Sequence, residues 1–147
     1  MSGEFIGTFP DNAVHKSRIM IPAKFKKKFA QDANEAVIVT IGPNGTVAIF
    51  PMDSWLFETA RLQVSELERH KKLLANLFDF AMPEQTLEGP GRIRISDELL
   101  KIAKIKDSVS IKGEGRFMTV WNSEVLKEIK QKKSEEHIET YDSTDYR

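Results

Sequence analysis

Basic side chains gather in one short stretch near the start of the chain. Between residues 10 and 30, Lys16, Arg18 and a run of four lysines from Lys24 to Lys28 accompany a single acid, Asp11. Lys and Arg neutralise phosphate groups, so such a cluster can bind a nucleic-acid backbone. The lysine run is less suited to this, because four lysines over five positions cannot all lie on one helix face and charge runs are usually solvated. Lys16 and Arg18 are therefore the better candidates.

The opposite charge lies at the other end of the chain. The formal net charge is zero, from 22 basic and 22 acidic residues, which argues against a uniformly basic nucleic-acid binder. From Ser134 onward, however, the chain carries five acidic residues, and its only basic residue of the Lys or Arg type there is Arg147. This acidic tail offsets the basic start in the whole-chain sum. A local basic surface is therefore compatible with a neutral chain.

Other kinds of site find little support in the residue types. The chain has no cysteine, and its three histidines are scattered without a second ligand at metal-site spacing, so we expect no metal and no cofactor. The Gly-containing segment 113–116 is typical of a hairpin turn and lacks the spacing of a phosphate-binding loop. No nucleophile stands beside a base. These features predict a protein that is not an enzyme and has no small-molecule substrate.

The composition is that of an ordinary globular protein. The hydrophobic fraction is 40% and the charged fraction 30%. No apolar run approaches the roughly 20 residues that a membrane helix needs, and the first residues lack the basic and apolar regions of a signal peptide. We therefore expect a cytoplasmic protein with no membrane partner.

The chain contains an internal repeat. Arg18 aligns with Arg92, and the match continues well past the two arginines. Isoleucines at a period of two predict a strand with one buried face in each copy; they are Ile19 and Ile21, and Ile93 and Ile95. Residues 36–55 and 107–126 then match as strand, Gly-containing turn, strand and helix start. Each copy is thus predicted as strand, short helix, hairpin and helix.

The repeat divides the chain into three predicted segments. Residues 5–81 form the first copy and its connecting helices, with a helix junction expected near Ser65. Residues 82–133 form the second copy with a C-terminal helix, and residues 134–147 form an acidic tail with little order. Each copy is too small to bury its apolar faces alone. We therefore predict an α+β fold in which the two copies intertwine as a β-barrel with pseudo-two-fold symmetry and flanking helices.

Further apolar residues fall on the connecting helices. Trp55, Phe57, Leu73 and Leu77 exceed what a small core needs, which favours self-association. The pattern is equally compatible with a place inside the core. Both readings stay open at the level of sequence.

Four motifs, taken in order, resemble the MraZ family of bacterial transcriptional regulators. They are EFIGTF, HKSRIMIPAKF, FPMDSW and EGPGRIRIS, within a resemblance that covers residues 5–130. The resemblance implies two tandem swapped-hairpin copies of the AbrB/SpoVT type. It also implies a cytoplasmic, nucleoid-associated regulator that forms closed rings of many subunits. Such a ring would bind repeated short sites on double-stranded DNA upstream of the division and cell-wall gene cluster.

The resemblance assigns DNA contact to loops that carry the family's Asp-x-x-x-Arg signatures. Carried over to this chain, the first signature gives Lys16 and Arg18, and the second gives Arg92 with Glu88 at the acid position to orient it. Arg offers a planar fork to phosphate oxygens or guanine edges. Val14 replaces the acid of the first signature, so we expect Arg18 to be held less firmly and to read bases less well.

An alternative follows from these departures. The chain could be a structural or protein-interaction ring of the same fold that has lost specific DNA recognition. Val14 and the zero net charge favour this reading. The two hypotheses differ in whether an operator-like duplex competes better than random DNA.

Overall fold

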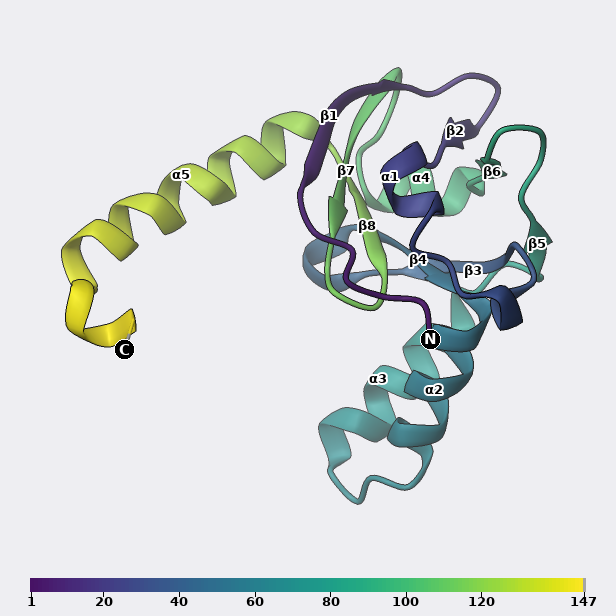
Figure 1. Ribbon diagram of the computed structural model, residues 1–147, viewed down its shortest axis with the longest axis horizontal. Helices are drawn as coiled ribbons and strands as arrows, with labels where there is room; N and C mark the ends of the chain where they lie inside the picture. Colours follow the sequence, from purple (N-terminus) through teal and green to yellow (C-terminus); the bar gives the residue numbers. More distant parts are fainter. Residues whose placement is uncertain (147) are drawn as a thin grey trace.

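Eight short strands and five α-helices build the protein in a computed structural model that describes residues 1–146 (Figure 1). The strands are β1 (Thr8–Ala13), β2 (Arg18–Met20), β3 (Ala36–Ile41), β4 (Val47–Pro51), β5 (Gln85–Thr86), β6 (Arg92–Arg94), β7 (Ser108–Gly113) and β8 (Met118–Trp121). The α-helices are α1 (Ala23–Lys26), α2 (Met52–Gln63), α3 (Glu68–Asp79), α4 (Asp97–Ile102) and α5 (Ser123–Thr140). Single 3-10 turns span Gln31–Ala33, Pro43–Gly45 and Ser143–Tyr146. None of the helices in the described range is long and apolar enough to cross a membrane.

The strand order has a symmetry of its own. Six strands form one antiparallel sheet in the order β1-β7-β8-β4-β3-β5, and β2 and β6 form a separate two-stranded ribbon. The sheet order reads the same from either end when each strand is exchanged for its counterpart in the sequence alignment. At its centre Ala48 lies opposite Thr119, and in the ribbon Ile19 lies opposite Ile93. Both pairs join positions that the alignment equates.

The mixed α and β composition agrees with the predicted class, but the predicted closed barrel is not found. β1 and β5 are the two edges of the sheet and do not pair with each other anywhere in the described chain. β5 is only two residues long, and β1 has an irregular register between Phe9 and Asn12. Short and irregular edge strands of this kind offer no continuous ladder with which to close a sheet. The ribbon packs beside the open sheet as a separate unit.

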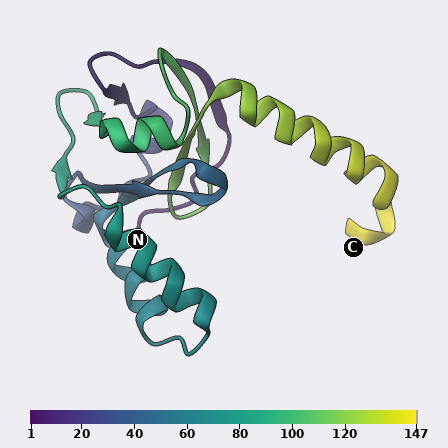
Figure 2. The same ribbon diagram turned by 180° about the vertical axis from the view of Figure 1, so that it is seen from behind.

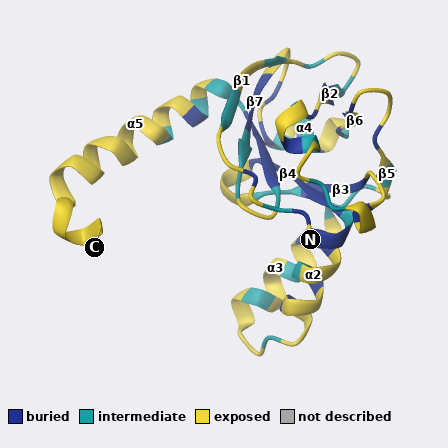
Figure 3. Cartoon of the chain, in the orientation of Figure 1, coloured by how far each residue is buried: buried dark blue, intermediate teal, exposed yellow. Residues whose placement is uncertain are grey.

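The ribbon is fixed to the body by its inner face. Ile19, Ile21, Ile93 and Ile95 each expose at most 1% of their surface, as their period of two predicts. They share one core with the inner residues of the sheet and with Phe25 of α1. Burying a side chain of this size stabilises the fold by about 1.5–3 kcal/mol. Figure 3 shows this buried interior, and the outer face of the ribbon stays in solvent.

Helices α2 and α3 form a hairpin that projects from the sheet (Figure 1). The predicted junction near Ser65 is confirmed, because α2 ends at Gln63 and α3 begins at Glu68. Trp55 and Leu77 are buried in a second, smaller core, whereas Phe57 and Leu73 expose 41% and 43%. The core reading therefore holds for Trp55 and Leu77, whereas Phe57 and Leu73 remain available at the surface.

Helix α5 leaves the body in another direction, and Figure 2 shows from behind that it stands clear of the α2–α3 hairpin. Asn122 caps its first turn by accepting from the backbone N–H groups of Glu124 and Val125, at 2.9 and 3.3 Å. The helix continues through residues 134–140, where the acidic composition predicted little order. Gln131 supports this extension, since its side chain donates to Glu135 one turn later at 3.0 Å.

Candidate nucleic-acid interface

Three arginines share the outer face of the β2–β6 ribbon. The strands pair antiparallel with Arg18 opposite Arg94 and Met20 opposite Arg92. Because side chains alternate along a strand, the buried isoleucines between them turn these residues toward solvent. Arg92 and Arg94 are exposed and Arg18 is half-exposed. The ribbon therefore presents a small cationic surface that is rigid along its backbone.

A tight turn between β1 and β2 carries Lys16 at its tip. His15 and Arg18 exchange both backbone hydrogen bonds, at 2.9 and 3.0 Å, around the central residues Lys16 and Ser17. Their φ angles are 51° and 63°, which is the left-handed pair of a type I′ hairpin. Such turns usually contain Asn and Gly. Lys and Ser disfavour the left-handed backbone conformation, so the surrounding structure must hold them in it. The exposed Lys16 is thereby fixed at one end of the ribbon.

The matching loop before β6 uses glycine for a comparable bend. Glu88 and Arg92 exchange backbone hydrogen bonds at 2.9 and 2.8 Å around Gly89 and Gly91, whose φ angles are 52° and 128°. The Arg92 guanidinium lies over this loop, because a Cβ built on Gly89 would stand 3.4 Å from Arg92 Nη2. The two turns lie at opposite ends of the ribbon, since Gly91 bonds to Ile21 and Ser17 bonds to Ile95.

The acid Glu88 pairs with a different arginine from the expected one. Arg18 Nε donates to Glu88 Oε1 at 3.3 Å, and no contact joins the side chains of Glu88 and Arg92 among the described residues. The expected orientation of Arg92 by Glu88 is therefore corrected. The reason is that Arg92 folds over Gly89, while the antiparallel ribbon brings Arg18 within reach of Glu88.

This ion pair changes the expectation for Arg18. Val14 faces the core and holds no charge, but the second copy supplies the missing acid from 70 positions away. Arg18 also donates from Nη1 to the backbone oxygen of Lys16 at 3.4 Å. The side chains of the pair expose 41% and 54%, so water screens the attraction and the pair contributes at most about 1 kcal/mol. Arg18 is thus oriented, yet free to exchange Glu88 for another anion.

Arg94 is a candidate contact that the sequence reasoning missed. It lies on the same face as Arg18 and Arg92, and the alternation Arg-Ile-Arg-Ile from position 92 was the signal that could have found it. Gln85 holds its backbone, because the Gln85 amide accepts from Arg94 N–H and donates to Arg94 oxygen, both at 2.8 Å. The side-chain amide replaces a strand neighbour and fixes the position of Arg94.

The lysine run is divided around a very short helix. α1 spans only four residues, and Lys24 and Lys27, three positions apart, are both exposed to solvent. Lys26 approaches Glu35 at 3.8 Å and Lys28 approaches Glu4 at 3.9 Å. Two of the four lysines thus approach acids and the other two are exposed, which agrees with the interpretation of the run as solvated charge.

Comparison with known proteins places the chain in a family. The chain is 30% identical over 143 residues to the transcriptional regulator MraZ of Corynebacterium kroppenstedtii, covering 96% of this chain and 94% of that protein. It is 28% identical to the transcriptional regulator MraZ of Koribacter versatilis over 84% of this chain and 85% of the relative. The protein of the same name from Clostridium tetani is 30% identical over the same shares. No model of a protein family matches the chain. With a relative this similar over almost its whole length, the chain belongs to the MraZ family of transcriptional regulators.

Proposed function

We propose that this transcriptional regulator acts by binding double-stranded DNA with the outer face of the β2–β6 ribbon. Arg18, Arg92 and Arg94 contact the duplex from the ribbon, and Lys16 contacts phosphate from the turn at its end. The observation that carries the proposal is the shared outward face of the three arginines. The names of the relatives supply independent support for a role in transcription.

A two-stranded ribbon is an element that the major groove of DNA accepts. That groove is roughly 12 Å wide and admits a two-stranded β-ribbon. Arginine can donate two parallel hydrogen bonds to the O6 and N7 atoms of guanine, or bind phosphate oxygens in the same way. Met20 lies opposite Arg92 on the exposed face, two residues after Arg18, and offers an apolar contact to a thymine methyl group. The face therefore combines charge with the means to read bases.

The proposal extends to the organisation of the chain. We infer that each half is a swapped-hairpin copy of the AbrB/SpoVT type, because β1 of the first half pairs with β7 of the second, and β5 of the second pairs with β3 of the first. We also propose a ring-shaped homo-oligomer that binds repeated promoter sites upstream of the division and cell-wall gene cluster, in the cytoplasm and on the nucleoid. Repeating a weak contact around a ring raises affinity through effective concentration.

One observation favours the alternative of a ring without specific DNA recognition. The guanidinium of Arg18 already contacts Glu88, and an acid beside the ribbon repels phosphate. If this acid dominates, DNA binding is weak and insensitive to sequence. Competition between an operator-like repeat and a random duplex separates the two functions, because only the regulator prefers the repeat.

The experiment is a fluorescence anisotropy titration of labelled duplex at low salt. Arg18→Ala combined with Arg92→Ala removes two charge-assisted contacts, each worth about 1.5–3 kcal/mol, so the pair should weaken binding by at least about 100-fold. Arg69→Ala is the matched control, since Arg69 is exposed on α3 and away from the ribbon. Equal binding by the double variant and the wild type would remove the mechanism.

A further inference from the structure

Helix α5 is an arm anchored only at its base. Leu126 is buried, and Lys130 Nζ donates to Thr8 Oγ1 at 3.0 Å. Every described residue from 131 onward is exposed. An 18-residue helix is about 27 Å long, so its outer part extends well beyond the body (Figures 1 and 2). The arm leaves its distal end without a partner in its own chain.

That distal end carries an apolar knob, which we define as Ile138, Tyr141 and Tyr146. They expose 79%, 51% and 73%. Ile138 lies in the last turn of α5, and Tyr141 follows directly after the helix, with its backbone N–H bonded to the oxygen of His137. The ring of His137 contacts both tyrosine rings, at centroid distances of 5.0 and 5.8 Å, and so gathers the two tyrosines of the knob into one cluster. A cluster of large apolar side chains at the end of an arm is typical of an interaction site.

The residues around the knob are acidic. Positions 134–146 contain five Asp or Glu residues and no Lys or Arg. Glu135 and Glu139 lie one turn apart on α5, on either side of Ile138 in the sequence. A surface that receives this end of the helix must therefore be apolar in the middle and cationic at its edge.

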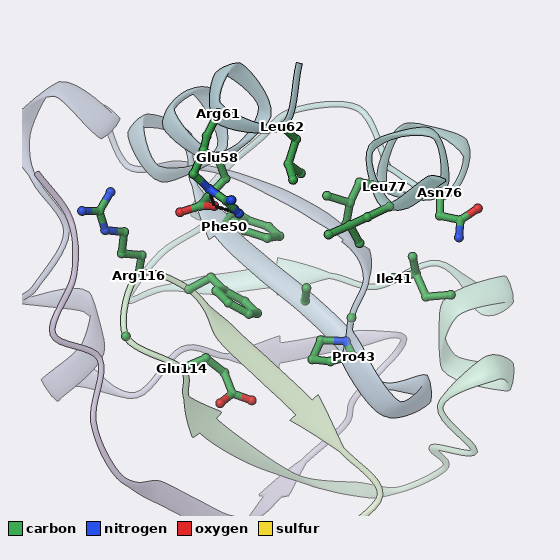
Figure 4. A pocket seen from close by; sticks show the side chains of 15 residues that line it. Ile41, Pro43, Phe50, Glu58, Arg61, Leu62, Asn76, Leu77, Glu114 and Arg116 are labelled. Atoms are coloured by element: carbon green, nitrogen blue, oxygen red, sulfur yellow. Dashed lines mark hydrogen bonds and ion pairs between the residues drawn. The ribbon is translucent and has the colours of Figure 1, made fainter. Parts of the chain in front are cut away.

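The α2–α3 hairpin and the β7–β8 turn enclose a groove with that chemistry (Figure 4). Its volume is about 510 Å³, and its floor is apolar, with Phe50, Phe117, Leu73 and Leu77 among the lining residues. Phe50 and Phe117 stack with ring centroids 4.7 Å apart, and Leu73 exposes 43%. A groove of this size holds several side chains.

The charges at the edge of the groove complement the arm. Glu58 is neutralised by Arg61 at 2.9 Å, and Glu114 by Lys112 at 3.2 Å. The guanidinium of Arg116 instead lies over the ring of Phe57 at 4.0 Å, and no carboxylate pairs with it in the part of the chain that the structure describes. The uncompensated charge of the groove is therefore positive, opposite to that of the arm.

We propose that the knob at the end of α5 docks into this groove on a second copy of the chain. The arm cannot enter its own groove, because the continuous helix directs it away from the hairpin (Figures 1 and 2). Knob and groove are different surfaces, so the contact is head-to-tail, and such contacts generate rings when the rotation closes. The binding mode is an amphipathic helix end in an apolar groove. This inference rests on the homo-oligomer of the proposed function and names its interface.

Cysteine cross-linking tests the contact without background, because the chain contains no cysteine. Leu73→Cys with Ile138→Cys places one thiol in the groove and one on the knob, and both sites are exposed enough to leave the fold intact. Under mild oxidation we expect a ladder of linked chains on a non-reducing gel, at least about tenfold stronger than for Leu73→Cys with Glu128→Cys. Position 128 is the control because it lies about 15 Å closer to the base of the helix than position 138. Ladders of equal strength would overturn the inference.

Two further variants separate the possible outcomes. Arg116→Glu in the cross-linking pair should weaken the ladder by at least about threefold, since it places like charges together. Ile138→Cys alone should not link; rapid dimer formation by this variant would show arms pairing with each other and would overturn the groove as partner.

Native mass spectrometry distinguishes failure of this inference from failure of the proposed function. The wild-type chain should form an oligomer, and a chain ending at Lys133 should fall to monomers at the same concentration. An unchanged oligomer in the shortened chain would refute the proposed contact of the arm but would remain compatible with a ring. A monomeric wild type would remove the ring itself. DNA titration of the same samples reports separately on the ribbon.

Discussion

Replacing Glu88 by glutamine tests how the net charge of the ribbon affects DNA binding. The outer face and its turn carry Lys16, Arg18, Arg92 and Arg94, and Glu88 subtracts one charge by pairing with Arg18 at 3.3 Å. The Glu88→Gln variant removes this negative charge and leaves the shape of the side chain unchanged. The ribbon should then bind DNA more tightly and depend more steeply on salt.

The magnitudes follow from the structure. A face with about three net charges gives a slope of log K against log salt near −2.7 for each subunit, and about four charges give a slope near −3.6. A carboxylate about 7 Å from a phosphate in a medium as polar as water repels it by about 0.6 kcal/mol, so its removal should raise affinity about threefold for each subunit engaged. Stability should change by less than about 1 kcal/mol, because both partners are half-exposed.

The assay is anisotropy titration of duplex DNA at several salt concentrations, with Glu66→Gln on the α2–α3 loop as a control for exposed acids far from the ribbon. If Glu88 also orients Arg18, the variant should gain affinity for random DNA more than for an operator-like repeat. Unchanged affinity and an unchanged salt slope would refute the idea that DNA approaches this face of the ribbon.

Three other substitutions have defined outcomes. Arg94→Ala should weaken DNA binding as much as Arg92→Ala in the same titration, since both side chains share the outer face; full retention of affinity would show that only one edge of the ribbon is used. Gly89→Ala should lower the free energy of unfolding by about 1 kcal/mol in urea, because φ is 52° and the new Cβ would press on the Arg92 guanidinium at 3.4 Å; an unchanged denaturation midpoint would contradict this strain. Burial alone would raise the pKa of Asp53, but hydrogen bonds from Ser2 and from the Ser54 backbone outweigh it and hold the pKa below the ordinary 3.8. The carboxylate therefore stabilises the fold above pH 3.8 and loses this effect as the pH falls through the lower folded pKa, so Asp53→Asn should flatten the acid limb of a stability curve, and an identical limb would count against the buried contact.

The sequence predicted the parts of the fold that depend on local patterns. Alternating isoleucines identified both ribbon strands and their buried face, because a period of two permits only one face to enter the core. The turn residues and the break near Ser65 located the hairpins and the helix junction. The resemblance to the MraZ signatures supplied Lys16, Arg18 and Arg92 as candidate DNA contacts; the structure places both arginines on the ribbon and Lys16 in the turn beside it, and their contact with DNA stays a prediction.

The remainder depends on contacts between distant residues. The family signature assigned Glu88 to Arg92, whereas in the structure Glu88 pairs with Arg18, 70 positions away. Arg94 was missed although the Arg-Ile-Arg-Ile alternation places it on the exposed face, because the alternation was used only to identify the buried isoleucines. The barrel was inferred from the need to bury two small copies, but the lengths of β5 and β1 decide closure and are set by tertiary pairing.

The exchange of edge strands between the halves determines how late in synthesis the first strand can pair. Thr8, near the N-terminus, pairs with Lys112, which is 104 residues later in the sequence. β1 therefore remains unpaired through most of translation. At about 5–20 residues per second this delay lasts roughly 5–20 s, during which the first half carries exposed strand edges and unburied isoleucines. Nascent chains of this protein therefore pass through an aggregation-prone interval, and a fragment that ends before residue 108 lacks the strand that pairs with β1.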